Sequence, residues 1–168
     1  MITQDRLMQI LIKGRYECYA RKSTDYNPYV KSDLYDWKFT LPIDNYSFTD
    51  AYQGFNPYSG VEYIYVDQIK LPIWSCDYIG YVNLDSIMSA EAIYAFLKEA
   101  RGIHLMNCQG NLFSDYEYEN EFLRYKTYFQ GNLAGLLQKE EFFYKNKLVA
   151  QQLSAGRLNE QLLRNPSR

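Results

Sequence analysis

Apolar residues recur at helical spacing near the start of the chain. Three of them fall on one side of a helix: Leu7, Ile10 and Leu11. Thr3 stands where an N-terminal cap belongs, and Gly14 stands where a left-handed residue commonly ends a helix. The pattern predicts an amphipathic helix over residues 3–13.

A second helical pattern covers residues 84–102. Its apolar face consists of Ile93, Phe96, Leu97 and Ala100. Asp85 or Ser89 can cap this helix, and Gly102 can end it. Both helical stripes need an apolar surface to cover them.

Alternating side chains predict strands in much of the remaining chain. The predicted strands are residues 15–20, 46–52, 61–66, 71–82, 122–131, 140–145 and 147–156. The turn "DQIK" at 67–70 joins two of them into a hairpin. Residues 21–44 carry turn signals, and residues 157–168 are expected to form a tail with a short helix.

The two halves of the chain follow the same order. "YQG" at 52–54 matches "FQG" at 129–131, and "EYIYV" at 62–66 matches "EEFFYK" at 140–145. These matches favour an internal repeat of residues 1–84 and 85–156 inside one domain that spans 1–168. The expected fold is α+β, a curved antiparallel sheet of about six strands with two helices on one face, from an α-βββ unit used twice.

Composition then limits the class of protein. The chain has 168 residues, of which 47% are hydrophobic and 23% charged, as in a globular domain. A net charge of −2 removes the broad attraction to phosphate, so no nucleic-acid partner is expected. No apolar run is long enough to span a membrane, and the first residues lack a signal-peptide core. We therefore expect a cytoplasmic protein without a membrane partner.

Few residues suit catalysis or metal binding. Cys18, Cys76 and Cys108 form no CxxC pair, which argues against a zinc site or a disulfide framework. His104 is the single histidine, and we expect a surface or satisfied side chain rather than a catalyst. No glycine-rich phosphate loop occurs. We expect no metal, no cofactor and no enzymatic activity.

Carboxylates are the remaining candidates for chemistry. Asp50, Glu62 and Asp77 lie on three consecutive predicted strands. Paired carboxylates can do acid–base work when burial separates their pKa values. The alternative is a solvated end of the sheet, or hydrogen bonds to turn backbone.

The hairpin of residues 61–82 is rich in aromatic rings. A four-residue turn would pair Val66 with Leu71, Ile64 with Ile73, and Tyr63 with Trp74. One face would then carry Tyr63, Tyr65, Trp74, Cys76 and Tyr78. The other face would carry Ile64, Val66, Leu71, Ile73 and Ile79, with Glu62, Ser75 and Asp77. The rings are interpreted as a second core, as the lining of a ligand pocket, or as a protein-binding surface.

Residues 114–121 form an acidic row. The acids Asp115, Glu117, Glu119 and Glu121 alternate with tyrosines and an asparagine. A row of this kind protects an exposed sheet edge from pairing. The alternative is a site for a cationic partner or Ca²⁺, although the glycine and spacing of an EF-hand loop are missing.

The stretch "YQGFNPYSGVEYIYVDQIKLPIWSCDYIGY" resembles the central motif of a bacterial family of uncharacterised domains. The matching residues are Gly54, Gly60, Glu62, Tyr65, Pro72, Trp74, Tyr78 and Gly80. Cys76 departs from the family pattern, in which a methionine is common, and "QQLSAGR" departs at the last strand. The resemblance implies a bacterial, cytoplasmic, non-enzymatic module, found alone or behind a Xre-type helix-turn-helix. It supplies no catalytic residue.

The resulting hypothesis is a binding module for a small uncharged or cationic ligand. The expected lining is Tyr63, Tyr65, Trp74 and Tyr78, with Glu62 and Asp77 at the rim. The alternative is an immunity-like or adaptor-like protein that binds a protein partner through its acidic and tyrosine-rich surface. An enzyme that uses buried carboxylates ranks below both hypotheses.

Overall fold

The computed structural model describes residues 2–22, 25–67 and 71–164. The elements in chain order are α1 (Gln4–Arg15), the π-helical turn η1 (Tyr16–Ala20), β1 (Val30–Lys31), β2 (Trp37–Ile43), β3 (Tyr46–Gly54), β4 (Tyr58–Val66), β5 (Pro72–Val82), α2 (Ala90–Asn107), β6 (Tyr116–Glu119), β7 (Leu123–Asn132), β8 (Gly135–Tyr144), β9 (Lys147–Leu158) and α3 (Glu160–Arg164). The class is α+β, as the sequence predicts.

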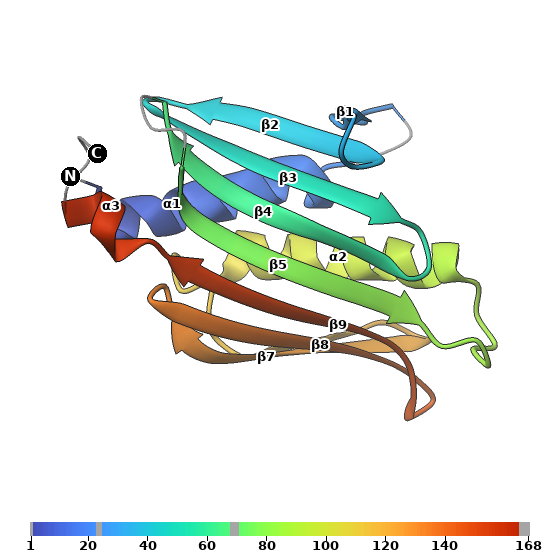
Figure 1. Cartoon of the computed structure of the whole chain (residues 1–168). Helices are drawn as coiled ribbons and strands as arrows, with labels where there is room; N and C mark the ends of the chain where they lie inside the picture. The colour runs from blue at the N-terminus through green and yellow to red at the C-terminus, as the bar shows by residue number, and fades with distance from the viewer. Residues whose placement is uncertain (1, 23–24, 68–70, 165–168) are drawn as a thin grey trace.

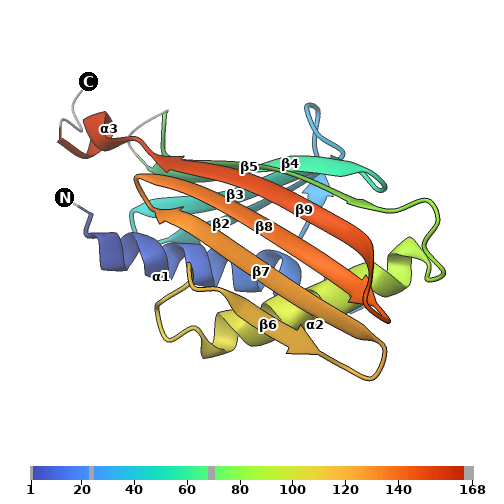
Figure 2. The ribbon, with the colours of Figure 1, turned by 90° about the horizontal axis from the view of Figure 1, so that it is seen from below.

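One antiparallel sheet forms the body of the molecule. Its strand order is β1-β2-β3-β4-β5-β9-β8-β7-β6. Helices α1 and α2 both lie on the same face of this sheet, and the sheet curves around them (Figures 1 and 2). The sheet has nine strands, so the expectation of about six is wrong. Residues 21–44 are rich in turn signals, so the sequence does not predict β1 and β2. These two strands lie at one edge of the sheet.

The first helix is longer than its sequence pattern predicts. Thr3 caps it as expected, since the Arg6 N–H donates to Thr3 Oγ1 at 3.1 Å. The helix does not end at Gly14, where an added Cβ would lie 2.2 Å from the ring of Phe48. It runs on into η1, so the strand predicted at 15–20 is wrong. Cys18 is buried and extends the apolar stripe at helical spacing.

The second helix also passes its expected end. Ser89 caps α2, because its hydroxyl accepts from the Ala92 N–H at 3.3 Å. Gly102 lies inside the helix rather than at its end. The buried residues His104 and Leu105 continue the inward face beyond it. None of the helices within the described ranges has the length and apolar character needed to cross a lipid bilayer.

The core has two parts, one beneath each long helix. The part beneath α1 includes Leu7, Ile10, Leu11, Phe48, Ile64 and Trp74. The part beneath α2 includes Ile93, Phe96, Ala100, Tyr125, Phe142 and Val149. Each helix therefore covers one half of the sheet.

The strand pairing of the two halves matches at equivalent positions. Strands β5 and β9 pair at the centre, and the order from β5 to β2 mirrors the order from β9 to β6. Asp50 on β3 is opposite Glu62 on β4, and Thr127 on β7 is opposite Glu140 on β8. An origin by duplication of residues 1–84 and 85–156 stays a prediction.

The hairpin of β4 and β5 forms, with a register that differs from the predicted one. Ile64 pairs with Trp74, and a bulge follows between Ile64 and Tyr65. The predicted pairs of Ile64 with Ile73 and of Tyr63 with Trp74 are wrong, whereas the pair of Tyr65 with Pro72 follows the predicted register. The bulge adds a residue that a simple turn does not include. Residues 68–70 of the predicted turn lie outside the described ranges.

Because the register differs from the predicted one, the side chains of the hairpin are divided between the two faces of the sheet in a different way. Glu62 and Ile64 share the inner face with Trp74, Cys76 and Tyr78. The outer face carries Tyr63, Tyr65, Ser75, Asp77 and Ile79. The aromatic residues that were predicted to share one face are therefore divided between two.

Candidate functional site

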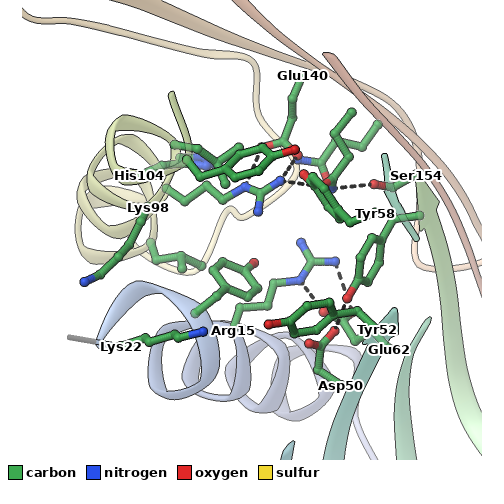
Figure 3. Close-up of a pocket in the computed structure, with 18 of the residues that line it drawn as sticks. Arg15, Lys22, Asp50, Tyr52, Tyr58, Glu62, Lys98, His104, Glu140 and Ser154 are labelled. Carbon is green, nitrogen blue, oxygen red and sulfur yellow. Dashed lines mark hydrogen bonds and ion pairs between the residues drawn. The ribbon is translucent and has the colours of Figure 1, made fainter. Parts of the chain in front are cut away.

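A cavity of about 580 Å³ lies between the inner face of the sheet and the helices. Figure 3 shows it bounded by both long helices and by strands of both halves. Its polar and aromatic lining includes Arg15, Tyr19, Lys22, Tyr29, Asp50, Tyr52, Phe55, Tyr58, Glu62, Tyr78, Tyr94, Lys98, Arg101, His104, Tyr125, Glu140, Gln152 and Ser154. The helices supply Arg15, Lys98 and Arg101, and the strands supply the three buried carboxylates.

The first buried ion pair ties α1 to β4. Arg15 donates from Nε to Glu62 Oε2 at 2.7 Å and from Nη2 to Glu62 Oε1 at 3.0 Å. The Trp74 indole N–H also donates to Glu62 Oε1, at 3.0 Å. Burial alone would lower the pKa of Arg15, but the Glu62 carboxylate holds it above its ordinary value. This pair is a fixed unit of two opposite charges in the cavity wall.

The second buried ion pair ties α2 to β8. Arg101 donates from Nε to Glu140 Oε1 at 2.8 Å and from Nη2 to Glu140 Oε2 at 2.5 Å. Tyr125 donates its hydroxyl to Glu140 Oε1 at 2.6 Å. Burial alone would raise the pKa of Glu140, but Arg101 and Tyr125 hold it below its ordinary value. The arrangement repeats that of Arg15 and Glu62 in the other half.

Gln152 on β9 links this second pair to the aromatic wall. Its Oε1 accepts from Arg101 Nη2 at 2.7 Å and from the Tyr58 hydroxyl at 2.6 Å. Its Nε2 donates to Ser154 Oγ at 3.1 Å. The amide is therefore held by bonds on both of its ends, which orients Tyr58 in the cavity.

Asp50 on β3 is the third buried carboxylate, with 3% of its surface exposed. Its Oδ2 accepts from the Tyr29 hydroxyl at 2.6 Å, and its Oδ1 accepts from the Tyr78 hydroxyl at 2.9 Å. Burial raises its pKa from 3.8 to about 6, against the opposing effect of the two tyrosines. The carboxylate of Glu62, directly opposite on β4, adds to this rise.

Aromatic rings form most of the remaining wall. Tyr29 meets Tyr52 edge-on with ring centroids 5.2 Å apart, and Tyr58 meets Tyr94 edge-on at 5.4 Å. Phe55 meets Tyr94 edge-on at 5.3 Å. Burial raises the pKa of Tyr58 to about 12, so its hydroxyl remains protonated and donates hydrogen bonds. The wall is apolar, with hydroxyl groups at its tips.

Two lysines lie on the side of the cavity away from the sheet. Figure 3 shows Lys22 between the two helices with its nitrogen toward the cavity, and Lys98 pointing away from it. Lys22 Nζ lies 5.3 Å from the ring centroid of Tyr29. Burial lowers the pKa of Lys22, and the charge of Lys98 lowers it further. The two like charges make this side of the cavity electropositive.

The predicted site residues are divided between the two faces of the sheet. Glu62 and Tyr78 line the cavity, and Trp74 supports Glu62 from a fully buried position. Trp74 also stacks on Phe113 with ring centroids 6.2 Å apart. The structure therefore brings three of the six predicted residues together.

The other three predicted residues, Tyr63, Tyr65 and Asp77, lie on the outer face. The rings of Tyr63 and Tyr65 contact each other, with centroids 5.6 Å apart. Asp77 borders an outer groove of about 910 Å³ that includes Ile79, Leu137 and Leu153. These residues do not line the inner cavity.

His104 differs from the sequence expectation of a surface or satisfied residue. It is buried, stacks on Tyr116 with ring centroids 4.7 Å apart, and borders the cavity. Its Nε2 has no hydrogen-bond partner among the described residues. Burial lowers its pKa, which favours the neutral ring. Among the described residues, no cluster of three His, Cys, Asp or Glu side chains is suited to hold a metal ion.

Sequence reasoning missed both arginines, Glu140, Tyr29 and Tyr58. One signal could have found Arg101, which follows Leu97 by one helical turn and so falls on the apolar face of α2. A charged residue at such a position usually needs a buried partner. Its partner Glu140 is 39 residues away in the chain, so local patterns do not identify it.

Comparison with known families gives one match. The model of a family described as a domain of unknown function (DUF5680) matches residues 50–158. No curated protein and no solved structure matches the chain. The matched region begins at Asp50 and includes both buried glutamates, whereas Arg15 and Tyr29 precede it. This match confirms that the chain resembles a family of uncharacterised domains.

Proposed function

The chain belongs to the DUF5680 family, and we propose that it is a non-enzymatic module that binds a small organic molecule in the cavity between its sheet and its helices. The ligand is uncharged or cationic. The observation that carries this proposal is the cavity itself, with aromatic walls and a few convergent polar groups. Its volume of about 580 Å³ falls in the range of small-molecule sites.

Protein interiors are normally packed without voids larger than a water molecule. The cavity here is partly open to solvent, and the part of its lining that is unfilled lacks the partner atoms of a packed core, which costs stability. The cost is understandable if the cavity has an occupant. The open groove on the outer face is different, because it lies on the exposed side of the sheet.

The two ion pairs keep the cavity open before a ligand arrives. Arg15 reaches from α1 to Glu62, and Arg101 reaches from α2 to Glu140. Each pair holds one helix at a fixed distance from the sheet. A site held in its binding shape loses less conformational entropy when a ligand binds.

Acid–base catalysis would use Asp50, whose pKa burial raises to about 6. Both of its oxygens accept hydrogen bonds from the hydroxyls of Tyr29 and Tyr78. Burial raises the pKa of both tyrosines, so they donate hydrogen bonds without passing on a proton. A binding role explains the buried Asp50 carboxyl group without requiring a group that exchanges protons with it, which catalysis would need.

Native mass spectrometry of the full chain, purified from its natural host, tests the binding function. We expect an extra mass of a few hundred daltons that is lost on denaturation. Ala95→Trp places a large ring at the cavity wall on α2 and should abolish this mass. Ala92→Trp, on an exposed part of the same helix outside the cavity lining, is the matched control and should retain it. An extra mass of equal abundance in both variants contradicts the proposal.

The second candidate, a protein-interaction function, relies on the acidic strand β6. Glu117 on that strand contacts Lys126 at 2.8 Å and Arg124 at 3.8 Å, so its charge is already partly compensated. This lowers the rank of the acidic surface as a binding site. Reversing the charge of Glu117 and Glu119 should weaken a co-purifying complex if this candidate is correct.

A further inference from the structure

We propose that the ligand carries a protonated amine at its inner end, and that Asp50 is the counter-ion of this amine. The inference rests on the proposed binding function and names the chemistry of the ligand. The starting observation is that, of the three buried carboxylates that line the cavity, Asp50 alone makes no ion pair with a described residue.

The described residues that line the cavity include three buried carboxylates and two guanidinium groups, and also the less buried Lys22, Lys98 and Glu91. The guanidinium of Arg15 forms an ion pair with Glu62, and that of Arg101 forms an ion pair with Glu140. Each of these pairs is neutral as a unit. Asp50 makes no ion pair with any described residue.

Hydroxyl groups stabilise Asp50 without neutralising it. Tyr29 and Tyr78 each supply one hydrogen bond. A carboxylate has about four lone-pair positions, so about two remain for another donor. Its pKa of about 6 leaves this group about nine-tenths ionised at pH 7. A buried charge without a counter-ion is costly, which makes a cationic occupant favourable.

The other half of the sheet shows that the fold does not need an acid here. Thr127 occupies the equivalent place opposite Glu140, and its hydroxyl accepts from Gln138 Nε2 at 3.2 Å. Asp50 faces Glu62 across β3 and β4, and like charges at such positions are destabilising. An acid that costs stability, where the equivalent strand has a neutral side chain, points to a ligand.

The surroundings of Asp50 suit an ammonium group. The rings of Tyr52, Tyr58 and Tyr78 line the same cavity, and aromatic faces attract cations. Lys22 and Lys98 lie away from the sheet, and Lys22 Nζ already lies over the ring of Tyr29 at 5.3 Å from its centroid. Their positive charges disfavour a second amine there. The site therefore selects a molecule with one inner amine and a neutral or acidic outer end.

Three probes of similar shape and different charge test the inference. They are 2-phenylethylamine (cationic), 2-phenylethanol (neutral) and phenylacetate (anionic), each titrated into the full chain by calorimetry at pH 7.5. We expect the amine to bind at least about tenfold more tightly than the alcohol. Asp50→Asn should remove this preference. Asp77→Asn, which removes a carboxylate from the outer face, is the control and should retain the preference.

Each outcome decides between the two proposals. Equal affinity for amine and alcohol, with both losing affinity in Ala95→Trp, overturns the amine inference and leaves the binding function standing. Failure of all three probes to bind at millimolar concentration counts against both. If Asp50→Asn does not fold, Tyr78→Phe decides, because it keeps the carboxylate and removes one hydroxyl donor. The preference for the amine should then increase, and an unchanged preference overturns the inference.

Discussion

Asp50 and Glu62 lie directly opposite each other on neighbouring strands, and both are buried. Glu62 is held by the guanidinium of Arg15, whereas Asp50 is held by two tyrosine hydroxyls. The same strand positions in the second half hold Thr127 and Glu140. The first half therefore has a buried carboxylate, without an ion pair among the described residues, where the second half has a neutral side chain.

The buried pair of Arg15 and Glu62 predicts a large effect of removing one partner. Arg15→Met leaves the Glu62 carboxylate buried without a cation, and the free energy of unfolding should fall by about 3–5 kcal/mol. Denaturant unfolding of the purified variant measures this. The double variant Arg15→Met with Glu62→Leu should regain much of the loss, because no charge is then left unpaired.

The exposed pair of Lys147 and Asp85 is the control for this experiment. Lys147→Met should leave the free energy of unfolding close to that of wild type, because solvent screens an exposed pair. A similar loss for Lys147→Met and Arg15→Met would show that the buried pair has no special role.

Two helical glycines should respond to alanine in opposite directions. A Cβ at Gly14 would lie 2.2 Å from the ring of Phe48, so Gly14→Ala should destabilise the protein by about 1–3 kcal/mol. At Gly102 the nearest contact, Ala20 Cβ, is 3.5 Å away, so Gly102→Ala should stabilise by up to about 1 kcal/mol. Thermal unfolding of both variants checks the pair. Stabilisation by Gly14→Ala would contradict the packing of α1 on β3.

Asp50 should make the ligand-free protein less stable as the pH rises. Its pKa rises from 3.8 to about 6 on folding, so the folded state holds the proton more tightly than the unfolded state. The stabilisation from this group is complete below about pH 4 and is lost as the pH rises through about 6. The loss amounts to at most about 3 kcal/mol.

The difference between wild type and Asp50→Asn isolates this contribution. The pKa of Glu140 is lowered, so its stabilisation is present at higher pH and is lost on acidification, in both proteins. Unfolding curves at several pH values from 4 to 7 should show wild type losing stability relative to the variant. Parallel curves would mean that Asp50 titrates as an ordinary carboxyl group.

Local patterns in the sequence predict the local features of this fold. The caps at Thr3 and Ser89 and the hairpin of β4 and β5 all depend on neighbouring residues, and all are present. The bulge after Ile64 has no comparable signal, and it moved Tyr63 and Tyr65 to the outer face. One misplaced residue was enough to divide the predicted site, because side chains alternate along a strand.

The charged part of the cavity could not be predicted in this way. Arg15 and Glu62 are 47 residues apart, and Arg101 and Glu140 are 39 apart. Each pair joins a helix to a strand, so only the packing of one on the other brings them together. Glu62 was identified from its place beside aromatic residues, but its partner was not.

If Asp50 is the counter-ion of a bound amine, its own pKa must respond to that amine. A carbon NMR titration of this carboxyl in the full chain, with and without 2-phenylethylamine, measures the response. We predict a pKa of about 6 in the free protein and a lower value when the amine is bound, because a nearby cation favours the ionised form. A pKa that does not change at saturating amine, or an ordinary value in the free protein, would contradict it.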